Sequence, residues 1–263
     1  MSVRFERVTK TFGSHPTVKT VLKEVSFEVA KGEILFILGK SGVGKSVTLK
    51  HIVGVMKPDS GAVFVDDENV SQMEALDLAD VRRKCGMVFQ HPALLDSLTV
   101  FQNVSFGLRT PQFTKSLPKP LAEKEIRQIV LEKLALVNLG ADVLDRMPPE
   151  ISYGMQKRVS LARTLAPAPR YLLFDEPTTG LDPITTNAVN DLIFELSRKL
   201  KVTSIVVSHD MACALKIADR ILVLDQGRIL ALDTVEKIKR SSEPLIRDFL
   251  SETLALLPPE ERP

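Results

Sequence analysis

The feature that most constrains this chain is the octapeptide GKSGVGKS at 39–46, which fits the pattern G-x-x-x-x-G-K-[ST]. Glycines in this pattern let backbone N–H groups wrap around phosphate oxygens, and the N-terminus of a following helix favours their charge. An apolar run at Glu33 to Leu38 precedes the loop and predicts a strand buried on both faces. Val47 to Met56 follows it with a helical pattern. Strand, glycine-rich loop and helix together predict a nucleotide-binding α/β core.

The loop predicts ATP with Mg²⁺ as the cofactors. Lys45 is placed to reach the β and γ phosphates, and Ser46 to hold magnesium through its hydroxyl. The backbone of the whole loop is expected to bind phosphate. Its residues are Gly39, Lys40, Ser41, Gly42, Val43, Gly44, Lys45 and Ser46.

Two carboxylates end another apolar run, YLLFDE at 171–176. Asp175 is predicted to orient magnesium, and Glu176 to polarise an attacking water as the general base of ATP hydrolysis. A strand that ends in two acids is commonly only a solvated turn. The phosphate loop in the same chain favours the catalytic interpretation.

Two further polar residues follow apolar runs. Gln90 comes after MVF and is a candidate magnesium ligand or γ-phosphate sensor, and His209 comes after SIVVS and is a candidate to contact the γ-phosphate. Either residue alone would ordinarily be surface. Their common position at strand ends predicts one site at one edge of a sheet.

Composition restricts the kind of protein. The 263 residues are 44% apolar with a formal charge of +2, which disfavours disorder and gives no basic excess for nucleic acid. The cysteines Cys85 and Cys213 are too few for a disulfide framework. Apolar runs are far below the ~20 residues that span a bilayer, so a cytosolic protein is expected, and any membrane must be spanned by another protein.

Remaining patterns predict the organisation of the chain. Alternating apolar residues at Val3, Phe5 and Val8 and at 25–29 predict an N-terminal antiparallel β subdomain. Helical patterns at 100–108 and 121–136, joined by TPQFTKSLPKP, predict an α-helical subdomain inserted at about 91–165. Runs at 221–224 and 229–232 predict a hairpin. We expect an ATPase domain at 1–240 with a mostly parallel P-loop NTPase core, and a tail at 241–263.

With these motifs in this order, the sequence resembles the nucleotide-binding subunit of an ABC transporter from Val3 to about Leu232. The resemblance implies that Phe12 stacks on adenine; a core phenylalanine is the alternative. It places Gln90 in the Q-loop, Asp175 and Glu176 in the Walker B motif and His209 at the switch position. Leu181 and Asp182 match the D-loop, and Asp182 before Pro183 also suits a helix N-cap.

The family signature, usually LSGGQ, corresponds here to ISYGMQKR at 151–158. Ser152 and Gly154 match it, while Tyr153 and Met155 do not. The resemblance implies a head-to-tail homodimer in which Ser152, Gly154, Met155 and Asp182 meet the ATP bound by the second copy. Tyr153 stands where the family has a glycine close to phosphate.

Met155, together with FDEPTTGLDPIT and HPALLDSLTVFQNV, is most like the Mla/Mce group, whose ATPases move phospholipid between bacterial membranes. That likeness implies integral permease subunits that contact the chain near Ala93, Leu94 and Leu95, and an Mce-type lipid-binding subunit reached through the permease. The chain would then lie on the cytoplasmic face of the cell membrane.

Two alternatives remain open from sequence: the ATPase of another ABC importer or exporter, and an ATP-switched regulatory module of the cell envelope. A nucleic-acid-associated ABC ATPase predicts tandem halves or long inserted arms, and this sequence has a single set of motifs.

Overall fold

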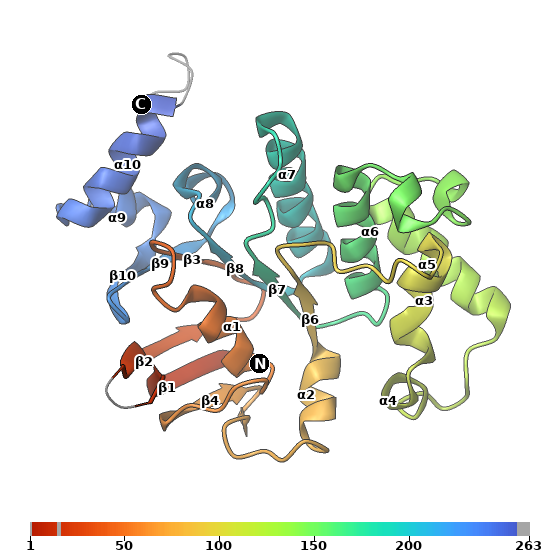
Figure 1. Cartoon of the computed structure of the whole chain (residues 1–263), viewed down its shortest axis with the longest axis horizontal. Helices are drawn as coiled ribbons and strands as arrows, with labels where there is room; N and C mark the ends of the chain where they lie inside the picture. Colours follow the sequence, from red (N-terminus) through yellow and green to blue (C-terminus); the bar gives the residue numbers. More distant parts are fainter. Residues whose placement is uncertain (1, 15–16, 257–263) are drawn as a thin grey trace. The chain divides into compact units, whose positions relative to one another are not determined.

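The computed structural model describes residues 2–14 and 17–256, and the chain forms two structural units (Figure 1). Unit 1 combines Met1–Gln72 with Ser204–Pro263, and unit 2 is the contiguous segment Met73–Thr203. The end of the predicted tail, 257–263, lies outside the described residues. No helix in the described ranges has both the length and the apolar character needed to cross a membrane.

The N-terminal part of unit 1 is an antiparallel sheet, as predicted, with strand order β2-β1-β4-β5. Its strands are β1 (Val3–Phe12), β2 (Lys19–Val29), β4 (Ser60–Val65) and β5 (Glu68–Asn69). The alternating residues Val3, Phe5 and Val8 are buried, and the ring of Phe5 stacks on that of Phe27 with centroids 4.5 Å apart. A bulge, in which Arg7 has φ 43°, explains why Phe5 and Val8 lie three residues apart on the same face.

The second group of strands in unit 1 is centred on β3 (Ile34–Leu38), whose five side chains are all buried. Strand β3 pairs in parallel with β8 (Thr203–Ser208) on one side and β9 (Arg220–Asp225) on the other. Strand β10 (Arg228–Thr234) returns antiparallel to β9 through Gln226 and Gly227, both with positive φ, which suits a type I′ turn. The predicted parallel core and hairpin are therefore confirmed.

The helices of unit 1 are α1 (Lys45–Ile52), α8 (Met211–Ile217), α9 (Val235–Lys239) and α10 (Pro244–Leu256). The prediction that the first of these reaches Met56 is wrong. Helix α1 ends four residues earlier because Gly54 adopts φ 61° and its N–H bonds to the carbonyl of His51. A glycine with positive φ commonly ends a helix.

Unit 2 has a parallel strand pair, β6 (Cys85–Val88) and β7 (Tyr171–Asp175). Helix α2 (Leu78–Lys84) leads into β6, and α7 (Pro183–Leu200) follows β7. In the register of the pair, Val88 lies opposite Phe174. The segments that carry Gln90 and Glu176 therefore leave the same end of these two strands.

The rest of unit 2 is helical, and α3, α5 and α6 pack on one another (Figure 1). Its elements are α3 (Val100–Ser105), a 3₁₀ turn at Phe106–Arg109, α4 (Pro111–Thr114), α5 (Glu123–Leu136), 3₁₀ turns at Ala141–Val143 and Pro148–Glu150, and α6 (Tyr153–Leu165). The buried faces of these helices include Val104, Val130, Leu134 and Leu161.

Two predicted helical boundaries in this region differ from the structure. The pattern at 100–108 forms an α-helix only as far as Ser105 and continues as a 3₁₀ turn, since Pro111 forces Thr110 into an extended conformation. The Pro-rich segment predicted as a connection contains α4, in which Thr110 caps the helix and Pro111 occupies its first position.

Candidate functional site

The phosphate loop connects β3 to α1 in unit 1. Gly44 has φ 113°, and a Cβ atom there would lie 2.7 Å from Cδ2 of Leu22 and 3.0 Å from the carbonyl oxygen of Val21. Both the backbone conformation and the close approach of β2 therefore require glycine at this position. The glycine that the sequence pattern places before the lysine thus has a conformational reason, and the pattern predicts that the loop backbone binds phosphate.

Lys45 is the first residue of α1 and is only 7% exposed. Its ammonium donates hydrogen bonds to the carbonyl oxygens of Gly39 at 2.8 Å and Lys40 at 3.3 Å. The side chain thus folds back over the loop and directs its positive charge to the space the loop encloses. Ser46, the next residue, is half-buried in the first turn of the helix. A cation, a hydroxyl and main-chain N–H donors in this arrangement fit a nucleotide phosphate with its Mg²⁺.

Two other candidates belong to unit 1. Leu38 and Ser208 are register partners in β3 and β8, so Gly39 and His209 leave adjacent strands at the same level. His209 is exposed, and the neighbouring Asp210 caps α8 by accepting from the N–H of Cys213. Phe12 is 37% exposed at the end of β1, with the Lys10 ammonium 5.8 Å from its ring centre. Its ring is not part of the buried core.

The carboxylates Asp175 and Glu176 lie in unit 2, at the end of β7, and both are half-buried. Glu176 has φ 49°, a left-handed conformation that costs a non-glycine residue on the order of 1 kcal/mol or more. Its carbonyl accepts from the N–H of Thr179 at 3.3 Å, which closes the turn. The strand thus ends abruptly at the predicted base, and the chain turns there.

The signature residues form the start of α6. Ser152 is exposed and is the N-cap, its hydroxyl accepting from the N–H of Met155 at 3.3 Å. A Cβ atom added at Gly154 would lie 3.5 Å from Cγ2 of Thr185. Tyr153 is 37% exposed, and its hydroxyl lies 3.3 Å from Nδ1 of His91.

Asp182, the D-loop candidate, is the N-cap of α7. Its carboxylate accepts from the N–H of Thr185 at 3.0 Å and from the hydroxyl of the same residue at 2.6 Å. These hydrogen bonds lower the pKa of the Asp182 carboxyl. The capping role considered from the sequence is confirmed.

One residue that sequence reasoning missed joins several candidates in unit 2. Lys157, buried in α6, donates from its ammonium to the main-chain carbonyls of Gln90 and Pro177, at 2.7 Å each. The side chain of Gln90 is exposed beyond this contact. The structure therefore brings together the Q-loop candidate, the signature helix and the residue after Glu176. The only sequence signal was a lysine within the signature segment, where a solvated side chain is the usual expectation.

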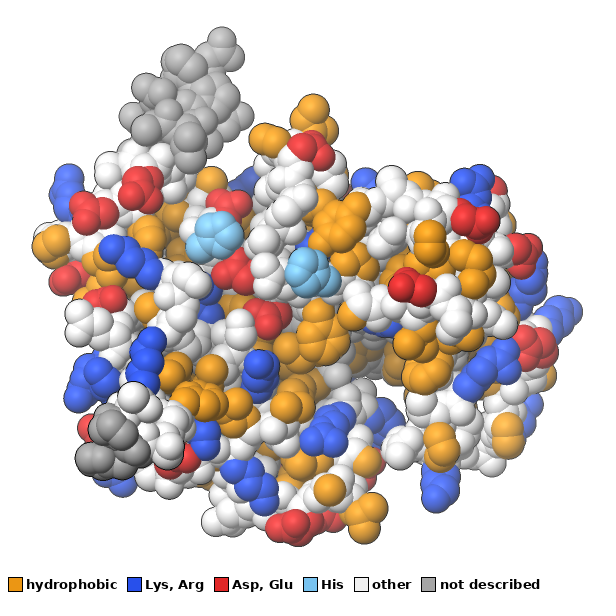
Figure 2. Space-filling model, viewed as in Figure 1, with side chains coloured by type: hydrophobic (Ala, Val, Ile, Leu, Met, Phe, Trp, Pro, Cys, Tyr) orange, Lys and Arg blue, Asp and Glu red, His pale blue; other side chains and the backbone are white. Residues whose placement is uncertain are grey.

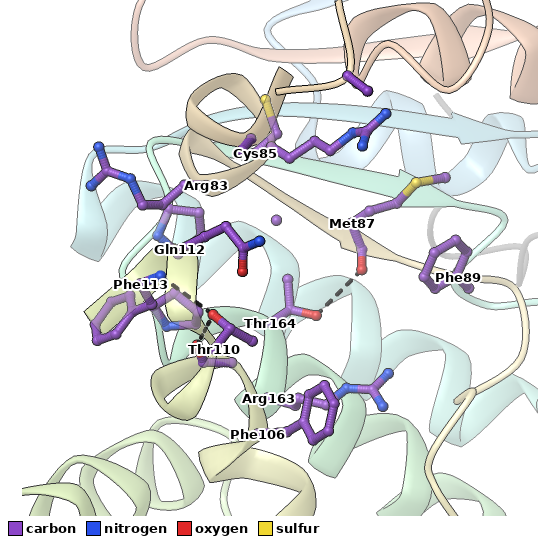
Figure 3. A pocket seen from close by; sticks show the side chains of 17 residues that line it. Arg83, Cys85, Met87, Phe89, Phe106, Thr110, Gln112, Phe113, Arg163 and Thr164 are labelled. Carbon is purple, nitrogen blue, oxygen red and sulfur yellow. Dashed lines mark hydrogen bonds between the residues drawn. The ribbon is translucent and has the colours of Figure 1, made fainter. Parts of the chain in front are cut away.

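Unit 2 also carries a groove of about 500 Å³ (Figure 3). Arg83 and Phe113 lie on one side, Met87 and Phe89 on the other, and Arg163 lies at the lower edge of this view. Gly86 forms part of the wall, where a Cβ would lie 2.6 Å from Cγ2 of Thr164.

The predicted permease contact lies beside this groove, because the Arg163 guanidinium donates to the carbonyls of Ala93 at 2.8 Å and Pro92 at 3.3 Å. Leu95 is 41% exposed and Leu94 is half-buried. Apolar side chains reach the surface over the helices of unit 2 on the face in Figure 2.

Known proteins resemble both the sequence and the fold. The family model described as "ABC transporter" matches residues 22–179. The methionine import ATP-binding protein MetN of Carboxydothermus hydrogenoformans is 38% identical over 252 residues, which cover 95% of this chain and 72% of that protein. The probable ribonucleotide transport ATP-binding protein mkl of Mycobacterium tuberculosis is 36% identical over 95% of this chain and 67% of its own length.

Among solved structures, a dimeric ATP-binding cassette in a post-hydrolysis state with ADP and Pi has a TM-score of 0.80 at 32% identity, covering 89% of this chain and 98% of that one. The structure of cbiO1 from Clostridium perfringens, described as part of the ABC transporter complex cbiONQ, has a TM-score of 0.78 at 27% identity, covering 95% of this chain and 98% of that one. The order of motifs, the phosphate-loop geometry and these likenesses agree. The chain therefore belongs to the ABC transporter family, as an ATP-binding subunit that hydrolyses ATP with Mg²⁺.

Proposed function

We propose that this chain powers a membrane transporter through ATP hydrolysis by the residues that the sequence singled out. The observation that supports this proposal is the phosphate loop, where Gly44 has a conformation that requires glycine and the buried Lys45 ammonium donates to the carbonyl of Gly39. Lys45 contacts the β and γ phosphates, and the loop backbone from Gly39 to Ser46 donates to phosphate oxygens. Bound Mg²⁺ would neutralise charge on the phosphates, with Ser46, Gln90 and Asp175 as its protein ligands.

Hydrolysis needs a base and a group that senses the γ-phosphate. Glu176 takes the proton of the attacking water, and His209 hydrogen-bonds the γ-phosphate. The role of His209 is supported by the strand register, in which Gly39 and His209 directly follow the paired residues Leu38 of β3 and Ser208 of β8. Phe12 stacks on the adenine ring, a role supported by its exposure at the end of β1.

The working form is a head-to-tail homodimer in which Ser152, Gly154, Met155 and Asp182 complete the site of the second copy. Ser152 lies exposed at the N-terminus of α6, a 13-residue helix whose dipole favours an anion there. The dimeric state of the solved cassette that this chain resembles supports the arrangement. Asp182 keeps its capping role within the subunit.

A permease subunit docks on the groove and on the adjoining segment Ala93 to Leu95. The groove combines aromatic side chains with Arg82, Arg83 and Arg163, which suits a short helix with an apolar face and an acidic residue. Phe89 and Phe106, which line it, are 44% and 50% exposed. An exposed apolar surface of this kind is typical of a contact site. Docking there would hold the chain at the cytoplasmic face of the cell membrane.

The cargo we propose is phospholipid, with an Mce-type lipid-binding subunit reached through the permease. Support comes from Met155 in the signature and from the segments around 91–104 and 174–185, which are most like the Mla/Mce ATPases. The second candidate is methionine import, favoured by the 38% identity to a relative with that name. ATP-switched regulation without transport is the third.

The test is purification of the full chain from its native membranes with its partners, followed by reconstitution into vesicles. ATP-dependent movement of a labelled phospholipid, lost in the Glu176→Gln variant, is the expected result. Movement of labelled methionine without phospholipid would favour the second candidate. A complex that hydrolyses ATP but moves neither would favour regulation.

A further inference from the structure

Lys157 is a buried cation whose contacts are main-chain carbonyls. It is 6% exposed, and its ammonium donates to the carbonyl oxygens of Gln90 and Pro177 at 2.7 Å and of Thr179 at 3.4 Å. The Tyr153 ring lies 5.5 Å from the ammonium. Within residues 2–14 and 17–256, no carboxylate forms an ion pair with it. The positive charge is thus solvated by peptide dipoles and a ring face.

Such an arrangement is costly to build. An ammonium removed from water loses several kcal/mol of hydration, and a buried lysine is ordinarily paired with a carboxylate. If the task were only to pack α6 against its neighbours, an apolar side chain of similar length would serve at lower cost. What an ammonium adds is three donors, which match three carbonyl acceptors from two segments, one after β6 and one after β7.

The three carbonyls lie next to the proposed chemistry. Gln90, whose exposed side chain is the candidate magnesium ligand, gives its own carbonyl to Lys157. Pro177 directly follows Glu176, and Thr179 closes the turn by donating its N–H to the carbonyl of Glu176. Lys157 therefore fixes the main chain at Gln90 and immediately beyond Glu176, where the left-handed φ of Glu176 sets the direction of its side chain.

We propose that Lys157 is a positioning residue for ATP hydrolysis, one that ties the Q-loop and the turn after Glu176 to the signature helix α6. Through these hydrogen bonds, Lys157 fixes the position of the Gln90 amide relative to the Glu176 carboxylate. Because Ser152 caps the N-terminus of α6 and Lys157 lies on the same helix, contact of Ser152 with the ATP of a second subunit would affect both groups through Lys157. The inference rests on the roles proposed above for Gln90 and Glu176.

The first test compares Lys157→Met with Lys124→Met in the full-length protein. Methionine keeps most of the stem but has no donor, and Lys124 is an exposed lysine of α5, which makes it a matched control. We expect kcat to fall at least tenfold in Lys157→Met while the Kd for ATP changes less than threefold. The control should resemble the wild type. All assays are run well below the melting temperature of each variant.

A role in packing alone would lower the melting temperature of Lys157→Met without changing kcat, and that result would overturn the proposal. Glu176→Gln is measured beside it. If Glu176→Gln abolishes turnover and Lys157→Met does not reduce it, the positioning role of Lys157 is wrong, whereas the proposed catalytic site is retained. If Glu176→Gln turns over like the wild type, the proposed catalytic site itself is wrong. Should Lys157→Met fail to fold, Lys157→Leu, which also has no donor, replaces it with the same expected fall in kcat.

The contrast between kcat and the Kd for ATP is the readout that separates positioning from packing. A residue that positions Gln90 and Glu176 lowers kcat at unchanged ATP binding, whereas one that only packs α6 leaves kcat unchanged below the melting temperature.

Discussion

At the scale of single residues, Lys45 already has main-chain partners at Gly39 and Lys40. Alanine would leave the loop backbone in place but remove the only side-chain cation of the loop that is buried. We expect Lys45→Ala to lower turnover by at least about a hundredfold, or to abolish tight ATP binding, because backbone N–H groups cannot replace this charge. Turnover and nucleotide binding are measured on the same preparation. Unchanged turnover would remove the loop from the mechanism.

Tyr153 has contacts within its own subunit, to His91 and to the Lys157 ammonium. We therefore expect Tyr153→Phe to behave like the wild type and Tyr153→Gly to keep hydrolysis within a few fold. A hundredfold loss in Tyr153→Gly, about 2.7 kcal/mol of transition-state stabilisation, would instead mean that the ring contacts the reacting phosphate. Steady-state kinetics on the three proteins decides between these outcomes.

The buried charge of Lys157 also affects folding. Its pKa is lowered from 10.5 to about 8 in the folded protein, so the unfolded chain binds more protons between these values. The stability contributed by this group is therefore complete above pH 10.5 and is lost as pH falls through about 8. Denaturant unfolding should show wild type gaining stability relative to Lys157→Met between pH 8 and 10. A constant difference across this range would contradict the assigned pKa.

Sequence was sufficient to predict local geometry that depends on immediate neighbours in the chain. The loop at 39–46 and the N-cap at Asp182 are of this kind, because a glycine pattern or an Asp-Pro pair carries its own geometry. Lys157 is different. Its partners come from the segments after β6 and β7, and a helical lysine viewed in sequence is equally consistent with a solvated side chain.

At the scale of elements, the segment Ala93 to Leu95 is the part of unit 2 most open to test. Its main chain is fixed by Asn103, which donates from its amide to the Leu95 carbonyl and accepts from the Leu95 N–H. The side chain of Leu95 is 41% exposed, so a carboxylate there remains in water in the isolated protein. If the segment is a dock, the same carboxylate becomes buried when the permease binds.

We therefore expect Leu95→Asp to shift the melting temperature by no more than about 2 °C, to bind ATP normally and to be lost from purified membranes. Val55→Asp, a similar change at an exposed apolar side chain of unit 1, is the control and should stay with the membranes. Leu94→Asp is expected to behave like Leu95→Asp with a larger loss of stability, because Leu94 is half-buried. Normal pelleting of a stable Leu95→Asp protein would contradict docking at this segment.

Element identity was predictable where periodicity was strong, and element ends were not. The all-apolar β3 and the alternating β1 have the patterns of buried and half-buried strands. Helix α1 was predicted four residues too long because the apolar pattern continues through Val55 and Met56, whereas the φ of Gly54 depends on the hydrogen bond to His51. The apolar pattern therefore predicted the position of α1, whereas its end is set by the backbone conformation of Gly54.

At the scale of the whole molecule, Glu176→Gln should separate ATP binding from hydrolysis. An amide cannot act as a base, so turnover should fall by on the order of 10²-fold or more while folding and binding remain. ATP that is bound but not hydrolysed should then hold two copies together. Size analysis with ATP and Mg²⁺ should show a dimer. Monomers alone, unchanged by adding the membrane partner, would remove the support for a head-to-tail pair.

The division into a contiguous unit and a discontinuous one affects how the chain emerges from the ribosome. Strand β3 pairs with β8, and Ile34 meets Ser204 about 170 residues later in the chain. At typical synthesis rates, this apolar strand waits roughly 10 to 30 s for its partner, because the whole of Met73–Thr203 is synthesised in between. The apolar segment ILFIL is therefore exposed to aggregation during synthesis. We expect chaperones to bind this strand, which leads into the phosphate loop.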